Sequence, residues 1–192
     1  DQLKEENVHL GAELDVSRRI QQMMLPSSQE LLEIEDLEIV GYMKPADEVG
    51  GDYYDVFIHD EWVHIGIGDV TGHGLESGLL MLMTQTAIRT LVDHGESDPV
   101  IFLNTLNRIL FHNIQRMHVD KSLSLVFLNY HNRQLKLIGQ HEDIIVVREN
   151  SIIERIDTVE LGFPIGLEED ISRFVTEAII NLEPGDGIVL YT

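Results

Sequence analysis

The order of strand-like and helical segments constrains the fold of this chain more than any other feature. Strand patterns, with alternating apolar or β-branched residues, are followed by two long helical patterns and then by further strand patterns. The strand patterns cover residues 37–43, 53–58, 62–68, 122–130, 134–139, 144–148, 152–156, 174–182 and 187–192. The helical patterns cover 76–92 and the stretch from Pro99, with Asp98 as its cap. Because strands and helices do not alternate, we expect an α+β fold with antiparallel sheets covered by helices.

Composition narrows the function classes. The 192 residues hold 13 Lys and Arg against 34 Asp and Glu, a net charge of −21, and 43% are hydrophobic. So acidic a chain, without a basic stripe, argues against nucleic acid or anionic membrane as its main partner. The absence of cysteine excludes disulfides, thiolate metal sites and thiol catalysis. No signal peptide opens the chain and no apolar run approaches the ~18 residues of a membrane span, so we expect a cytoplasmic domain.

Residues 1–25 differ from the rest and predict a linker or coiled-coil helix, with residues 26–192 forming the main domain. A heptad-like series runs through Leu3, Asn7, Leu10, Leu14, Ser17, Gln21 and Met24. Leu25-Pro26 ends this helix, and Ser27-Ser28 begin the next turn. The helix either packs on its own domain or pairs with a second copy and relays a signal from an upstream sensor domain.

The stretch 65–74 carries the most informative chemistry. Val63, Ile65, Ile67 and Asp69 share one face of a strand, so Asp69 ends an apolar row that points at the core. A carboxylate there costs several kcal/mol unless it is protonated, hydrogen-bonded or bound to a cation. After it, Gly72 and Gly74 allow a ligand to approach the backbone closely. The alternative is that Asp69 only caps the following turn.

A second carboxylate lies in register with the first. Asp52 shares a strand face with Tyr54 and Val56, while Asp55 falls on the opposite face. A hairpin that turns near residue 60 places Asp52 beside Asp69. Adjacent inward carboxylates repel, which a shared proton or a divalent cation resolves. Oxygen ligands without cysteine favour Mg²⁺ or Mn²⁺ over zinc, and neither a complete dinucleotide fingerprint nor a phosphate-binding Gly-Lys-Ser/Thr loop is present.

These motifs resemble a known family. Residues 45–55 (PADEVGGDYYD) and 68–74 (GDVTGHG), preceded by 19–26 (RIQQMMLP) and followed by 183–192 (EPGDGIVLYT), are similar to the SpoIIE/RsbU-type branch of the protein phosphatase 2C (PPM) family. The resemblance implies a four-layer α-β-β-α sandwich of two antiparallel sheets flanked by helices. It also matches Asp52 and Asp69 to metal-binding aspartates, and Val70 to a position whose backbone carbonyl binds metal.

The implied activity is metal-dependent hydrolysis of phosphoserine or phosphothreonine on a protein, with two Mn²⁺ or Mg²⁺ ions in the complete domain. In bacteria the implied partner is a STAS-domain anti-anti-sigma factor in a partner-switching pathway. Such ions neutralise the phosphate and lower the pKa of an attacking water. No covalent enzyme intermediate is needed, which agrees with the absence of cysteine.

Several features stay open at this point. His73 is a general acid or a brace of its loop, and Lys44 contacts phosphate or is simply solvated. Family members continue the last strand with an Asp-Gly and carry a later aspartate, whereas this sequence stops at Thr192. We therefore expect an incomplete domain with weak metal binding and little activity.

The sequence also departs from the family motif in one loop and leaves alternative functions open. Gln140-His141-Glu142-Asp143 stands where relatives show Ala-Gly-His-x-x-Pro, so the substrate-facing details of relatives are not carried over to this loop. The alternative function is a binding module that recognises a STAS-type protein without hydrolysis; a purely structural dimerisation domain would leave Asp52 and Asp69 unexplained. We expect a homodimer, formed through the amino-terminal helix or through the exposed strand at 187–192.

Overall fold

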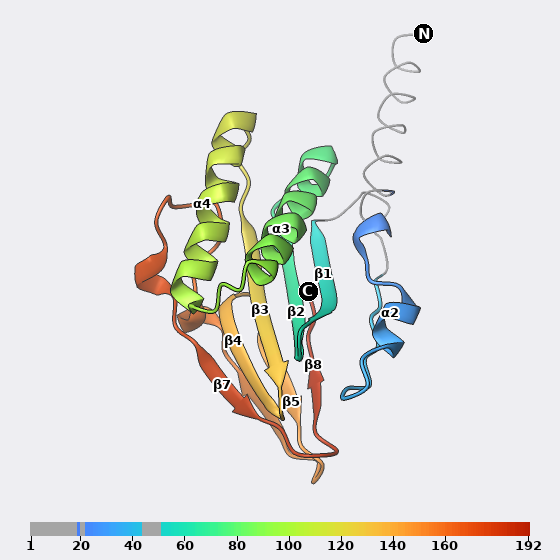
Figure 1. The fold of residues 1–192 in the computed structure, drawn as a ribbon. Coiled ribbons are helices and arrows are strands. Elements are labelled where there is room, and N and C mark those ends of the chain that lie inside the picture. The colour runs from blue at the N-terminus through green and yellow to red at the C-terminus, as the bar shows by residue number, and fades with distance from the viewer. Residues whose placement is uncertain (1–18, 20–21, 44–50) are drawn as a thin grey trace.

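The fold is built from two antiparallel sheets and one pair of long helices (Figure 1). The computed structural model describes residues 19, 22–43 and 51–192. The larger sheet has the order β1-β2-β3-β4-β7, formed by Asp52–His59, Trp62–Val70, Leu123–His131, Gln134–Gln140 and Ala178–Asn181. The smaller sheet has the order β6-β5-β8, formed by Ile153–Ile156, Ile144–Val147 and Gly187–Val189. The helices are α2 (Ser28–Leu32), α3 (Leu75–Asp93) and α4 (Pro99–Met117), with 3-10 turns at Val159–Leu161 and Ser172–Phe174.

The predicted β1–β2 hairpin is confirmed. Its turn holds Asp60 and Glu61, and Asp60 adopts a φ of 53°, the left-handed conformation that two-residue hairpin turns require. The resulting register pairs His59 with Trp62 at the turn and Asp52 with Asp69 at the open end. The hairpin therefore brings the two aspartates together at one edge of the larger sheet.

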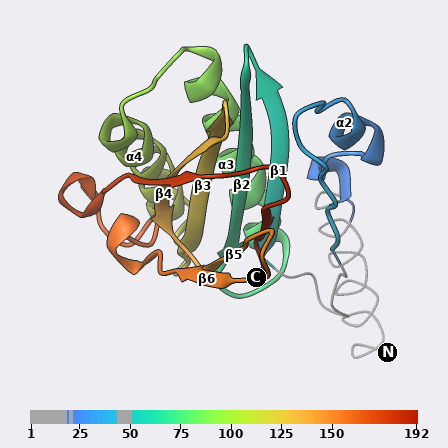
Figure 2. The ribbon, with the colours of Figure 1, turned by 90° about the horizontal axis from the view of Figure 1, so that it is seen from below.

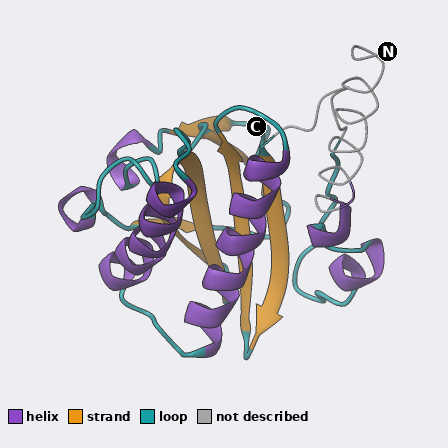
Figure 3. Ribbon diagram, turned by 90° about the horizontal axis from the view of Figure 1, so that it is seen from above, coloured by secondary structure: helices purple, strands orange, loops and turns teal. Residues whose placement is uncertain are grey.

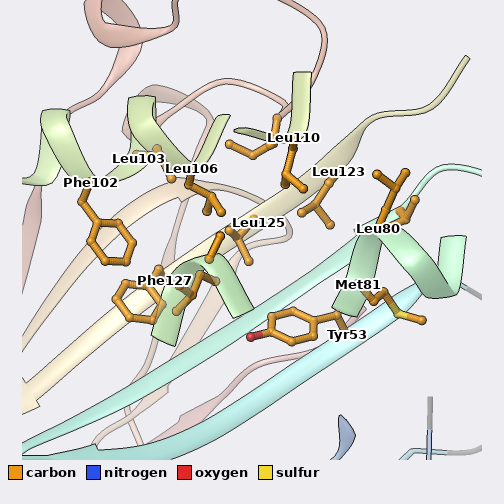
Figure 4. Close-up of a cluster of buried hydrophobic side chains, with 14 of the residues drawn as sticks. Tyr53, Leu80, Met81, Phe102, Leu103, Leu106, Leu110, Leu123, Leu125 and Phe127 are labelled. Carbon is orange, nitrogen blue, oxygen red and sulfur yellow. The ribbon is translucent and has the colours of Figure 1, made fainter. Parts of the chain in front are cut away.

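The two predicted long helices are also confirmed, and they cover one face of the larger sheet (Figure 3). The Asp98 carboxylate accepts hydrogen bonds from the N–H groups of Val100 and Ile101, as expected of a cap before Pro99. Apolar side chains from the helices interdigitate with side chains from the strands (Figure 4). The labelled members of this cluster are Tyr53, Leu80, Met81, Phe102, Leu103, Leu106, Leu110, Leu123, Leu125 and Phe127.

The smaller sheet and the α2 segment pack on the opposite face of the larger sheet. Val126 and Leu137 from the larger sheet share one buried cluster with Ile144 and Val146 of β5. Leu31 of α2 joins the same cluster, and two views place α2 beside β1 (Figures 1 and 2). The described part of the chain is thus layered as helices, larger sheet and smaller sheet, which confirms the α+β class with two antiparallel sheets.

The predicted strand at 37–43 is wrong. Burial alternates only over residues 37–40, where Leu37 and Ile39 pack against the cluster between the sheets while Glu38 and Val40 are exposed. The described residues contain no ladder partner for this segment, however, and residues 37–43 have no strand assignment. An alternating pattern reports which side of an extended chain faces the core, whereas a strand also needs a hydrogen-bonded neighbour.

Two predicted strands are shorter in the structure, and part of the amino-terminal helix falls outside the described residues. The strand predicted at 187–192 forms only over Gly187–Val189. The segment predicted as a strand at 174–182 forms one only over Ala178–Asn181, where it pairs with β4. Of the amino-terminal helix, Arg19 and 22–24 are described and are helical, and the helix ends before Pro26 as expected. The heptad positions before Met24 lie outside the described residues. No helix in the described ranges has the length and apolar character needed to cross a bilayer.

Candidate active site

Four polar residues lie side by side across β1, β2, β3 and β4, at the end of the larger sheet where β1 begins and β2 ends. Asp52 on β1 pairs with Asp69 on β2, and Asp69 pairs in turn with Ser124 on β3. His141 follows the end of β4, and the β3–β4 register, which pairs Leu125 with Gln140, places it next to Ser124. Directly paired residues in a sheet point to the same face. The two aspartates predicted from sequence therefore begin a row of four polar side chains.

The environment of Asp69 disfavours its charged form. Burial raises the pKa of the Asp69 carboxyl above its usual value, and the nearby carboxylate of Asp52 raises that pKa further. A cation bound between the carboxylates would offset both effects by its attraction for the charged forms. The pair is therefore poised to take up either a proton or a positively charged ligand.

The main chain adds a third oxygen beside Asp69, at Val70. The N–H of Val70 donates to the carbonyl oxygen of Gly51 at 3.0 Å. A Cβ atom added to Gly51 would lie 2.0 Å from the carbonyl oxygen of Val70 and 2.8 Å from Oδ1 of Asp69. Both oxygens thus face the same small space, which only a glycine at position 51 leaves open.

The end of the chain reaches this row from the smaller sheet. The hydroxyl of Thr192 donates to Oδ1 of Asp52, the first residue of β1, at 2.9 Å. Nε2 of His141 lies 3.1 Å from the carbonyl oxygen of Tyr191, and Nδ1 lies 2.8 Å from Oγ of Ser124. Burial lowers the pKa of His141, which favours the neutral ring.

These donors fit a hard divalent cation in part. Two carboxylates and a carbonyl oxygen, without sulfur, are the ligand types that Mg²⁺ and Mn²⁺ prefer. Within the described ranges, however, no three His, Asp or Glu side chains converge closely enough to enclose a metal ion. The described residues therefore offer suitable ligand types for a divalent cation without enclosing one.

The structure places two of the other residues singled out from sequence. His73 is exposed in the loop between β2 and α3, so its expected role as general acid or brace stays a prediction. Lys44 lies outside the described residues. Asp69 lies within β2 and does not cap α3, whose N-cap is Gly74.

Sequence reasoning missed three polar residues. Ser124 and His141 belong to the row, and no local sequence pattern pairs them with the aspartates, because α3 and α4 separate β2 from β3 in the chain. The third is Asp55, which is 1% exposed and receives two hydrogen bonds of 2.9 Å from the guanidinium of Arg89. Its position on the opposite face was predicted, but its ion pair was not.

Two bacterial proteins are similar in sequence to nearly the whole of this chain. The chain is 25% identical over 187 residues to the phosphoserine phosphatase RsbU of Bacillus subtilis, covering 95% of this chain and 53% of RsbU. It is also 25% identical over 207 residues to protein IcfG of Synechocystis, covering 94% of this chain and 32% of that protein. The chain thus spans about half of RsbU and about a third of IcfG.

Solved structures share the fold. The SiaA-PP2C domain of Pseudomonas aeruginosa matches with a TM-score of 0.70 at 22% identity, over 95% of this chain and 71% of that one. A serine/threonine phosphatase of S. agalactiae matches with a TM-score of 0.59 at 14% identity, over 77% of this chain and 74% of that one. The expected resemblance to a PP2C-type fold is confirmed.

The family itself follows from the sequence profile that matches most of the domain. The profile described as Stage II sporulation protein E (SpoIIE) covers residues 59–192, which is more than half of the chain. The matched residues include the Asp69 motif and the strands β2, β3 and β4 of the polar row. The match agrees with the similarity to RsbU and with the shared PP2C fold. The chain belongs to the SpoIIE family.

Proposed function

We propose that this chain is the phosphatase domain of a signalling protein and hydrolyses phosphoserine or phosphothreonine on a partner protein with the help of a divalent metal ion. One observation carries the proposal: Asp52 and Asp69 lie directly opposite each other in the β1–β2 ladder. Burial and the Asp52 charge disfavour an ionised, uncompensated Asp69. A cation between the two carboxylates turns this electrostatic conflict into a binding site.

Each residue has a defined task in the proposed reaction. Asp52 and Asp69 hold the metal with their carboxylates, and Val70 contributes its carbonyl oxygen. Bound Mn²⁺ or Mg²⁺ supplies positive charge to the phosphate and lowers the pKa of the water that attacks phosphorus. Gly51 leaves room for these oxygens, because a side chain there would displace the Val70 carbonyl. We propose two such ions, held with the help of further carboxylates.

The substrate and the control of the domain are also proposals. RsbU is named a phosphoserine phosphatase, and we extend this substrate class to the present chain, with a phosphorylated STAS-domain protein as the partner in a partner-switching pathway. We further propose that residues 1–25 connect the domain to an upstream sensor and pair two copies of the chain, and that the protein acts in the cytoplasm.

A second candidate is a binding module that recognises the phosphorylated partner without hydrolysing it. It is favoured by one observation: in the described ranges, no third acidic or histidine side chain completes a metal cage around the aspartate pair. The two candidates share the same surface and differ in whether phosphate is released.

Phosphate release from a phosphoserine-containing STAS protein separates the candidates. With Mn²⁺ present, the intact protein should release phosphate, and Asp69→Asn should reduce the rate by at least about 10²-fold, because it removes charge that holds the metal. Asp60→Asn, in the exposed turn at the far end of the same hairpin, is the matched control and should retain the rate. Tight binding of the phosphoprotein without release would support the binding module, and full activity of Asp69→Asn would refute the enzyme assignment.

A further inference from the structure

His141 connects two parts of the candidate site that no strand pairing joins. Strand β8 ends at Val189, and residues 190–192 continue without any ladder assignment. Within this segment, the Tyr191 carbonyl meets His141, and the Thr192 hydroxyl meets Asp52. Leu190 packs against the apolar cluster between the sheets, and the two polar contacts tie residues 191 and 192 to the candidate site.

The hydrogen-bond partners determine the tautomer of His141. The Tyr191 carbonyl oxygen can only accept, so Nε2 of His141 carries a proton and donates to it. In the neutral ring Nδ1 is then an acceptor, and the Ser124 hydroxyl, 2.8 Å away, donates to it. Ser124 is the ladder partner of Asp69. The imidazole thus links the strand beside Asp69 to the segment beside Asp52.

The main chain of His141 is itself fixed by a buried residue. Its N–H donates to Oγ1 of Thr158 at 2.9 Å, and the same hydroxyl donates back to the carbonyl oxygen of His141. Thr158 is fully buried. Because two hydrogen bonds to a buried residue fix the main chain of His141, its imidazole can hold its own partners in place. Residues that orient metal ligands need such a fixed position.

We propose that His141, as the neutral Nε2–H tautomer, is a positioning residue that holds residues 191–192 against Asp52 and so fixes the geometry of the Asp52–Asp69 pair. The inference rests on the proposed metal-dependent function. His141 acts through Ser124 and Tyr191, because no third His, Asp or Glu in the described ranges joins the aspartates in a metal cage. It is therefore distinct from a ligand.

Two amide substitutions separate the two ends of this link. In His141→Gln the side-chain amide reaches the place of Nε2 and can still donate to Tyr191, whereas in His141→Asn the amide reaches only the place of Nδ1. His141→Phe keeps a ring and loses both hydrogen bonds. The control is His131→Phe, because His131 also bonds a main-chain carbonyl, that of Glu61, but at the other end of β3.

Mn²⁺ affinity of the intact protein is the first readout. We expect His141→Phe and His141→Asn to weaken Mn²⁺ binding by about tenfold or more, which is the usual effect of removing a residue that orients metal ligands. His141→Gln should bind Mn²⁺ within about threefold of the wild type. His131→Phe should bind as the wild type does. Wild-type affinity in His141→Phe, or an equal loss in the Gln and Asn variants, would overturn the proposal.

Nitrogen NMR of the wild-type imidazole is the second readout and needs no variant. Above the pKa of His141, Nε2 should be protonated and Nδ1 unprotonated; the opposite tautomer would overturn the assignment. Mn²⁺ binding separates the two proposals. If the wild type binds Mn²⁺ and His141→Phe binds it equally well, the positioning role is overturned while the proposed metal-dependent function stands. If the wild type binds no Mn²⁺, both are overturned.

Discussion

The position of Asp69 beside Asp52 lowers the stability of the folded protein whenever Asp69 is ionised and no cation is bound. Burial and mutual repulsion raise the pKa of Asp69, so its ionised form is less favourable in the folded protein than in the unfolded chain. The resulting penalty is fully present at pH values above the raised pKa and is relieved as the pH falls through it and Asp69 takes up a proton. A bound cation relieves the same penalty at neutral pH.

Gly51 makes the clearest prediction for a single residue. Gly51→Ala should lower phosphatase activity by about 10²-fold or more, because its Cβ would lie 2.0 Å from the Val70 carbonyl oxygen and would displace that oxygen or Asp69. Gly187→Ala is the matched control, since a Cβ there meets nothing within 4 Å. Steady-state phosphate release with both variants tests this; equal rates for the two variants would contradict it.

Between elements, the Asp55–Arg89 pair connects β1 to α3. Arg89 donates twice to the buried Asp55 carboxylate, and its guanidinium lies 4.5 Å from the centre of the Phe57 ring. Gln85, one turn earlier on α3, donates to both Asp55 and the carbonyl oxygen of Met24. The pair thus joins the strand that begins with Asp52 to the helix that touches the amino-terminal segment.

Removing only the cation of this pair should destabilise the fold. Arg89→Met leaves the Asp55 carboxylate buried without its partner and should lower the free energy of unfolding by about 2–3 kcal/mol, somewhat less than for a fully buried pair because Arg89 is half exposed. The double variant Asp55→Asn/Arg89→Met should lose less. Arg133→Met, which breaks an exposed 3.7 Å ion pair with Glu183, should change it by less than about 0.5 kcal/mol.

Urea unfolding measures all of these free energies. The account of the β1–α3 connection would be contradicted if Arg89→Met and Arg133→Met had the same effect, or if the double variant lost more stability than Arg89→Met alone.

Elements with local signals were predictable, and those that depend on distant partners were less so. The Asp98 cap with Pro99 and the short turn after His59 specify their structures within a few residues. Residues 37–40 carry the correct alternation, but whether they form a strand depends on a neighbour elsewhere in the chain. The short β7 strand, which pairs with only part of β4, has the same cause.

At the scale of the whole molecule, the sheet order creates the candidate site. The aspartates could be paired from sequence because a short hairpin turn fixes their register. Ser124 and His141 required the register of β3 and β4, which are separated from β2 by two helices. The contact of Thr192 with Asp52 joins residues 140 positions apart and belongs to the packing of the two sheets. No local sequence pattern predicts a contact over this distance along the chain.

Calorimetric titration of Mn²⁺ into the intact protein tests the central claim most directly, because it measures cation binding without requiring a substrate. We predict saturable binding to the wild type, and loss of most of that binding in Asp52→Asn, which removes one of the two facing carboxylates. The affinity should also fall as the pH drops toward the raised pKa of Asp69, since protons then compete for the site. Undiminished Mn²⁺ binding by Asp52→Asn, or no binding by the wild type, would contradict the account.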